Sequence, residues 1–81
     1  MKILFGAGTG TIKYLSSEVS KKMDFSFIVD NDPKLYGTKL FNIPVKSPEV
    51  LKNYLENNVE IFITALDEKS IQKQLKILSY F

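Results

Sequence analysis

The residues of this chain most suited to chemistry lie near its start, where an apolar segment runs into a glycine-rich one. Lys2-Ile3-Leu4-Phe5 predicts a buried strand, and Gly6-Ala7-Gly8-Thr9-Gly10-Thr11 predicts a turn that leads into a helix. The first N–H groups of such a helix have no intrahelical partner and lie at the positive end of its dipole. We therefore expect an anion site, in which Gly6 makes the tight turn and Gly8 lets a phosphate approach bare backbone.

The third position of this glycine pattern differs from the usual dinucleotide motif. In G-x-G-x-x-G the last glycine would fall on Thr11, whereas this chain has Gly10 one residue earlier. A threonine would hold helix and strand slightly further apart, and its hydroxyl could donate to a phosphate. We interpret the segment as a nucleotide site and Thr11 as mild evidence against an ordinary NAD site.

A second chemical group follows the next predicted strand, Phe25–Val29. Asp30 lies about 20 residues after the glycine turn, where the acid of a β-α-β unit meets the ribose hydroxyls of a nucleotide. Its alternative role is to cap the Asp-Pro turn through its own side chain. An asparagine in the position of Asn31 more often forms a turn, and contact with the ligand is the alternative role.

Residue types that are absent narrow the chemistry further. The 81 residues include no His and no Cys, which excludes a Ser-His-Asp triad, a Cys nucleophile and the usual zinc sites. All 11 basic residues are lysines, so there is no guanidinium clamp for a phosphate. We predict no catalytic residue and no metal site, and expect backbone, hydroxyl and carboxylate groups to hold the ligand.

Bulk properties limit the class of protein. A hydrophobic content of 44% and a net charge of +2, spread without a basic block, are ordinary for a globular chain and give no support to nucleic-acid binding. No apolar run reaches 18 residues and no leader pattern is present, so we expect no membrane span and a cytoplasmic location. The length allows one small domain at most.

Strands and helices alternate along the chain and must position these groups. We expect a loop over 34–41, a short strand at 43–45 whose Pro44 suits an edge or a strand start, and a strand over 59–65. Helices are expected over about 11–22, from the Ser47 cap to Asn57, and after the Asp67 cap. The last helix should bury a stripe made of Ile71, Leu75 and Leu78, with a staple between Leu66 and Ile71.

This order predicts an α/β, Rossmann-like, three-layer fold with a mostly parallel four-stranded sheet, order 3-2-1-4, and helices on both faces. The first strand is then central, and Thr64 and Ala65 end beside the glycine turn. We expect residues 1–81 to form one nucleotide-binding domain of a longer protein, or a subunit that completes its core in a homo-oligomer.

An ordered set of motifs resembles that of a known family. The motifs are Phe5-Gly6-Ala7-Gly8-Thr9-Gly10, Phe27-Ile28-Val29-Asp30-Asn31-Asp32-Pro33, Gly37, Asn42-Ile43-Pro44-Val45 and Ser47-Pro48-Glu49. The members of this family are the Rossmann-like N-terminal domains of bacterial sugar-nucleotide acyltransferases used in surface-glycan synthesis, and similar domains accompany methyltransferases and other polysaccharide-biosynthesis enzymes. The resemblance implies a nucleotide-sugar ligand, with Asp30 near ribose or base and catalysis located in another domain.

Three functions remain open at this point. The first is a nucleotide-sugar-binding, non-catalytic domain of a glycan-biosynthesis transferase, which we favour over NAD binding. The second is the cofactor-binding half of an NAD-dependent oxidoreductase, and the third is a ligand-free interaction module. The candidate ligand-binding residues are Gly6, Gly8, Thr9, Gly10, Thr11, Asp30, Asn31, Thr64 and Ala65.

Overall fold

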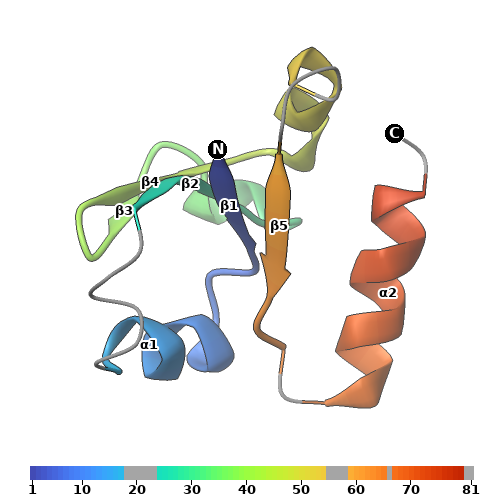
Figure 1. Ribbon diagram of the computed structural model, residues 1–81, viewed down its shortest axis with the longest axis horizontal. Coiled ribbons are helices and arrows are strands. Elements are labelled where there is room, and N and C mark those ends of the chain that lie inside the picture. The colour runs from blue at the N-terminus through green and yellow to red at the C-terminus, as the bar shows by residue number, and fades with distance from the viewer. Residues whose placement is uncertain (18–23, 55–58, 66, 80–81) are drawn as a thin grey trace.

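Five strands form a single sheet in the computed structural model, which describes residues 1–17, 24–54, 59–65 and 67–79 (Figure 1). The central strand β1 (Lys2–Phe5) pairs in parallel with β2 (Phe25–Val29) on one side and with β5 (Glu60–Ile63) on the other. On its outer side β2 pairs in parallel with β4 (Ile43–Lys46). The four expected strands therefore lie in the expected order around a central first strand.

The predicted number of strands was wrong, because the segment expected to be a loop contains a 3-10 helix and a strand. The 3-10 helix η2 (Pro33–Leu35) is followed by β3 (Lys39–Leu40), which pairs antiparallel with β4 at the edge of the sheet. Two residues with positive φ, Phe41 at 50° and Asn42 at 65°, join β3 to β4. A two-residue hairpin turn of this kind usually carries Asn-Gly or Asp-Gly, so Phe-Asn conceals it from a sequence pattern.

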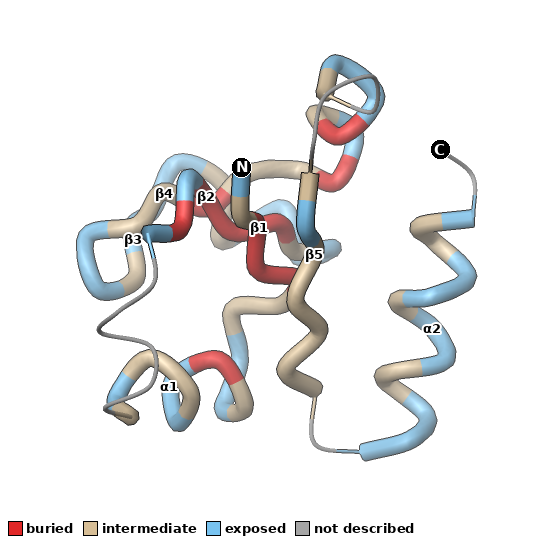
Figure 2. Tube along the Cα trace, in the orientation of Figure 1, coloured by how far each residue is buried: buried red, intermediate tan, exposed pale blue. Residues whose placement is uncertain are grey.

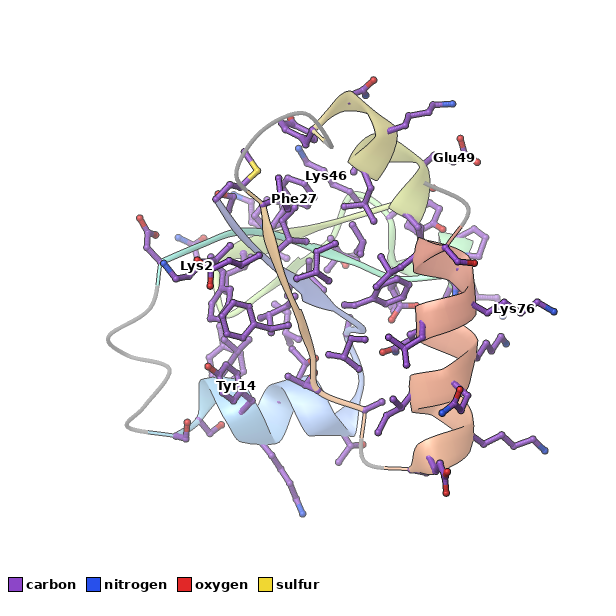
Figure 3. The ribbon with its side chains drawn as sticks, turned by 45° about the vertical axis from the view of Figure 1, so that its right-hand side comes forward. Lys2, Tyr14, Phe27, Lys46, Glu49 and Lys76 are labelled. Carbon is purple, nitrogen blue, oxygen red and sulfur yellow. The ribbon has the colours of Figure 1, made fainter. Side chains whose placement is uncertain are left out.

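Helical segments cover both faces of the sheet, which gives the predicted three-layer, Rossmann-like arrangement (Figure 1). On one face, α1 (Thr9–Leu15) packs Tyr14 and Leu15 against Leu4 and Ile28. The ring of Tyr14 meets that of Phe25 edge to face, with 6.0 Å between centroids (Figure 3). α1 ends at Leu15 with Ser16 as its C-cap, so the helix predicted over about 11–22 does not continue through Ser16 and Ser17. Residues 18–23, on which the predicted end falls, lie outside the described residues.

The opposite face is covered by η3 (Pro48–Asn53) and α2 (Glu68–Leu78). The predicted cap is present, since Ser47 accepts the N–H of Glu49 at 3.2 Å, but the element is a 3-10 helix where we expected an α-helix. Leu51 of η3 is 1% exposed and belongs to the core together with β1 and β2, where buried residues concentrate in Figure 2.

A bulge lets β2 bury two phenylalanines on opposite faces. The register between β1 and β2 shifts between Lys2 and Ile3, so that Phe25 and Phe27 face neighbouring residues of β1 and Ser26 is the extra, exposed residue. Phe25 consequently packs on the α1 side and Phe27 on the α2 side. Lys46 Nζ lies 4.8 Å from the centroid of the Phe27 ring (Figure 3).

The buried stripe of α2 differs from the predicted one. Leu75 is 46% exposed, while Ile77 and Leu78 pack against the core and Gln74 is half-buried. Lys76 points away from the sheet in Figure 3. The predicted stripe is therefore wrong at Leu75, because the face of α2 turned toward the sheet carries Gln74 instead. The expected staple involves Leu66, which lies outside the described residues.

Among the described helices, none is both long and apolar enough to cross a membrane.

Candidate functional site

Gly6 and Gly8 serve different purposes in the glycine turn. Gly6 has φ +102°, a region that side chains disfavour, and a Cβ there would lie 3.1 Å from Nε2 of Gln74. Its N–H donates to the carbonyl of Val29 at 2.7 Å, which ties the turn to β2. Gly8 has φ −94° and ψ −160°, which any residue can adopt, yet a Cβ there would meet no atom within 4 Å. Backbone geometry therefore requires Gly6, whereas Gly8 leaves space open.

Asp30 connects the end of β2 to the glycine turn. Its Oδ2 accepts the N–H of Ala7 at 2.7 Å, and its Oδ1 accepts the N–H of Asp32 at 2.8 Å. The second bond is the Asx turn that was the alternative reading of this residue. An ionised carboxylate has about four lone-pair sites, so two remain for another donor. The carboxylate thus positions the turn and still has capacity to accept from a ligand.

Thr11, at the position of the third glycine, closes the turn against β5. It is 1% exposed, its hydroxyl donates to the carbonyl of Gly6, and its Oγ1 lies 2.5 Å from Oγ1 of Thr64. A hydroxyl has one hydrogen, so the donor in the second contact is Thr64. The expectation that Thr11 donates to a phosphate is therefore not supported, because its hydrogen is already used.

These groups surround a cavity of about 320 Å³ at the carboxyl ends of β2, β1 and β5. That volume is near the lower limit for a small-molecule pocket. Asn31 is exposed and does not line the cavity. The other eight predicted residues do line it: Gly6, Gly8, Thr9, Gly10, Thr11, Asp30, Thr64 and Ala65.

The sequence reasoning missed the contribution of α2 to this cavity. Asp67, Ser70 and Gln74 line it as well, although we expected Asp67 only as a cap. Asp67 is that cap, since its Oδ2 accepts the N–H of Ser70 at 2.9 Å, and hydrogen bonds from Ser70 lower the pKa of the exposed Asp67 carboxyl. The spacing of the three residues, i, i+3 and i+7, places them on one helix face and is the signal that could have identified them.

The side-chain amide oxygen of Gln74 is in an unusual environment. This atom, Oε1, is buried and has no hydrogen-bond partner among the described residues. Buried polar side-chain atoms are normally paired, and an unpaired one costs about 1–3 kcal/mol. The atom is therefore a candidate to pair with a ligand, since no described residue pairs with it.

A second hollow, of about 430 Å³, lies between α1 and the end of β5. It is larger than the first but mainly apolar, and no carboxylate lines it. Neither Gly6 nor Gly8 lines it, so it does not suit a phosphate in contact with bare backbone. The first cavity is therefore the better candidate for a nucleotide.

Comparison with known proteins gives one curated relative and two solved structures. The redox-sensing transcriptional repressor Rex of Clostridium tetani (strain Massachusetts / E88) is 42% identical over 53 residues, which are 64% of this chain and 25% of the repressor. The chain thus spans about a quarter of that relative. No protein-family model matches the chain.

The solved structures share the fold. A Rex-family repressor called RSP has a TM-score of 0.71 at 19% identity, over 98% of this chain and 39% of RSP. RSP in complex with β-NADH has a TM-score of 0.70 at 20% identity, over 95% of this chain and 39% of RSP.

These findings correct the predicted function. The resemblance to sugar-nucleotide acyltransferase domains was wrong, since the similar proteins are Rex repressors. The prediction of a glycan-biosynthesis transferase was wrong for the same reason. A nucleotide sugar was also wrongly favoured over NAD, because a structural neighbour was solved in complex with β-NADH. The expectation of no nucleic-acid partner is overturned by a relative that is a transcriptional repressor, a class that acts on DNA.

Proposed function

We propose that this chain is the dinucleotide-binding part of a redox-responsive transcriptional regulator, and that it binds NADH or NAD⁺. The observation that carries the proposal is the cavity at the ends of three parallel strands, in which the glycine turn and the Asp30 carboxylate adjoin. In open α/β folds, dinucleotides bind across this edge of the sheet. The similarity to a redox-sensing repressor and to a protein solved with β-NADH supports the choice of ligand.

The ligand would lie across the sheet in the order of the strands. The pyrophosphate rests against Gly8, where no side chain occupies the space and no side chain caps the helix that follows. The adenosine ribose lies beside Asp30 at the end of β2. The nicotinamide half then extends past Gly6 toward Thr64, Ala65 and α2 on the other side.

The charge of the site favours NAD(H) over NADP(H). An acid after the second strand accepts from the ribose 2′-hydroxyl, whereas a 2′-phosphate would bring a like charge against Asp30. The usual solution for NADP is an arginine, and the chain has none. We therefore expect NADPH to bind at least about tenfold more weakly than NADH, a difference of about 1.4 kcal/mol.

DNA recognition is a proposal for the full protein rather than for this part of it. The described residues provide the candidate cavity for a nucleotide, and the lysines of the chain are spread without a basic block. We propose that the ligand state of this part controls a DNA-binding part, as the description of the relative as redox-sensing suggests.

Calorimetric titration with NADH, NAD⁺, NADPH and UDP-glucose tests the proposal. We expect NADH or NAD⁺ to bind, NADPH to bind more weakly and UDP-glucose not to bind. Asp30→Asn should reduce the preference for NADH over NADPH, because it removes the charge that repels the 2′-phosphate. Asp32→Asn is the matched control: Asp32 is exposed and bonds to the N–H of Lys34 at 3.0 Å, so the preference should not change. Binding of UDP-glucose alone, or of none of the four, would refute the proposal.

A further inference from the structure

The unpaired amide oxygen of Gln74 indicates a ligand contact beyond the glycine turn and Asp30. Gln74 lies two turns into α2, lines the cavity, and places its Nε2 beside Gly6, where a Cβ would come within 3.1 Å. Its Oε1 is buried without a partner among the residues that the structure describes. The side chain is therefore held against the glycine turn while its acceptor remains unused.

The chemistry of an amide oxygen limits what it can bind. An oxygen acceptor requires a donor, so the pyrophosphate of a dinucleotide, which is fully ionised at neutral pH and offers only acceptors, cannot satisfy it. A dinucleotide carries donors in its ribose hydroxyls and in the carboxamide N–H₂ of nicotinamide. Rotation about the last side-chain bond, which is a soft torsion, can turn the amide oxygen toward such a donor.

The position of Gln74 selects one half of the ligand. Asp30 follows β2, Gly6 follows β1, and Gln74 belongs to the helix that follows β5, so the three residues lie in the order of the strands β2-β1-β5. A dinucleotide with its adenosine ribose at Asp30 and its pyrophosphate at the glycine turn directs its second nucleoside toward α2. The donor nearest Gln74 therefore belongs to the nicotinamide nucleoside.

We propose that Gln74 is a specificity-determining residue whose amide oxygen accepts a hydrogen bond from the nicotinamide nucleoside of the bound ligand. This inference rests on the proposed function. No described residue of α2 is fully buried, and the helix packs on the core through its half-buried Ile77 and Leu78. Because this packing is limited, a ligand that contacts α2 can change how firmly the helix is attached to the sheet. A bond from the ligand to Gln74 adds an attachment of α2 to the glycine turn.

Gln74→Met provides the test, because methionine has a similar length and no amide. Binding of NADH and of ADP-ribose, which lacks the nicotinamide, is measured for the parent chain and the variant by calorimetry. We expect NADH to bind about tenfold more weakly to the variant and ADP-ribose to bind with unchanged affinity. The melting temperature of the free variant should be equal or higher, since an unpaired buried acceptor has been removed. Gln72→Met, the same change at an exposed position of α2, is the control and should change neither affinity.

The outcomes separate this inference from the function on which it rests. If NADH and ADP-ribose both bind the parent chain and Gln74→Met weakens neither, Gln74 does not contact the ligand. Equal weakening of the two ligands also overturns the inference, since the effect is then structural. If neither ligand binds the parent chain, the proposed function fails and the inference fails with it.

Discussion

Substituting Gly8 by alanine should separate ligand binding from stability. The backbone at Gly8, with φ −94° and ψ −160°, accepts a side chain, and the added Cβ would meet no atom within 4 Å. Replacing glycine at a compatible position stabilises by about 0.4–1 kcal/mol through the unfolded state. Alanine is a poorer helix N-cap than glycine by a similar amount, roughly 0.5 kcal/mol. The two effects offset each other, so the free energy of unfolding should change by no more than about 0.5 kcal/mol.

Binding should respond much more strongly, because the new methyl group occupies the space against which the pyrophosphate lies. We expect a loss of at least about tenfold in NADH affinity, or about 1.4 kcal/mol. At a NADH concentration of about 100 times the parent Kd, the ligand stabilises the parent by about 2.7 kcal/mol and the variant by about 1.4 kcal/mol. For a domain of this size the difference lowers the ligand-induced shift in Tm by roughly 5–10 °C.

Gly37→Ala is the control, in which we expect stability to fall and NADH binding to stay unchanged. Gly37 has φ +85° and, like Gly8, open space where a Cβ would be, but it does not line the cavity. The positive φ should cost about 1–2 kcal/mol and lower the Tm by roughly 4–16 °C. The shift that NADH adds should be unchanged. Thermal unfolding with and without NADH measures both quantities. A full NADH shift in Gly8→Ala would refute the placement of the phosphate at this residue.

Three further predictions concern the elements that support the site. Thr11→Val removes two part-buried hydrogen bonds, to Gly6 and Thr64, each worth about 0.5–1.5 kcal/mol, so urea unfolding should show a loss of about 1–3 kcal/mol. An unchanged midpoint would show that the hydroxyl bridge contributes nothing. Leu51→Ala should cost about 2–5 kcal/mol in the same assay because Leu51 is 1% exposed, and a loss below 1 kcal/mol would contradict its place in the core. The cap formed by Asp67 should stabilise α2 fully above the unfolded pKa of about 3.8, and this stabilisation should be lost as the pH falls through the lower folded pKa. Asp67→Ala should therefore flatten this part of the pH dependence of helical circular dichroism, and an identical acid profile in parent and variant would contradict the prediction.

Most of the candidate site could be predicted because it depends on local signals and on chain order. The glycine turn and the acid after the second strand are short-range patterns, and right-handed crossovers then place Thr64 beside the turn. The part that depends on side-chain packing could not be predicted. α2 turns Leu75 outward and places Gln74 in the lining of the cavity, whereas Asn31 is exposed and outside that lining.

The missed strand has a similar explanation. Phe41 and Asn42 both adopt positive φ between β3 and β4, and a phenylalanine in this conformation is rare outside the context of a folded sheet. Its side chain is 54% exposed, so burial does not explain the choice of residue. Tertiary pairing with β4 stabilises the hairpin in spite of its turn sequence.

The error in function has a different cause. The motifs that carried the resemblance to glycan-biosynthesis enzymes are the glycine turn, the Asp-Asn-Asp-Pro segment and the Ser-Pro-Glu helix start. In the structure, Gly6 makes a backbone turn, Asp30 an Asx turn and Ser47 a cap. Such features report the fold, and one fold carries many functions. The proposal of NAD(H) as the ligand therefore draws on the similarity to Rex repressors in addition to these residues.

The most direct test of the proposed function is to locate NADH on the chain by ¹⁵N–¹H NMR titration. The account predicts that the largest shifts fall on the backbone amides of Ala7, Gly8 and Thr9 and on that of Asp30, with saturation at a single site. Shifts confined to the apolar hollow around Tyr14 and Phe62, or no shifts from a folded chain, would contradict it.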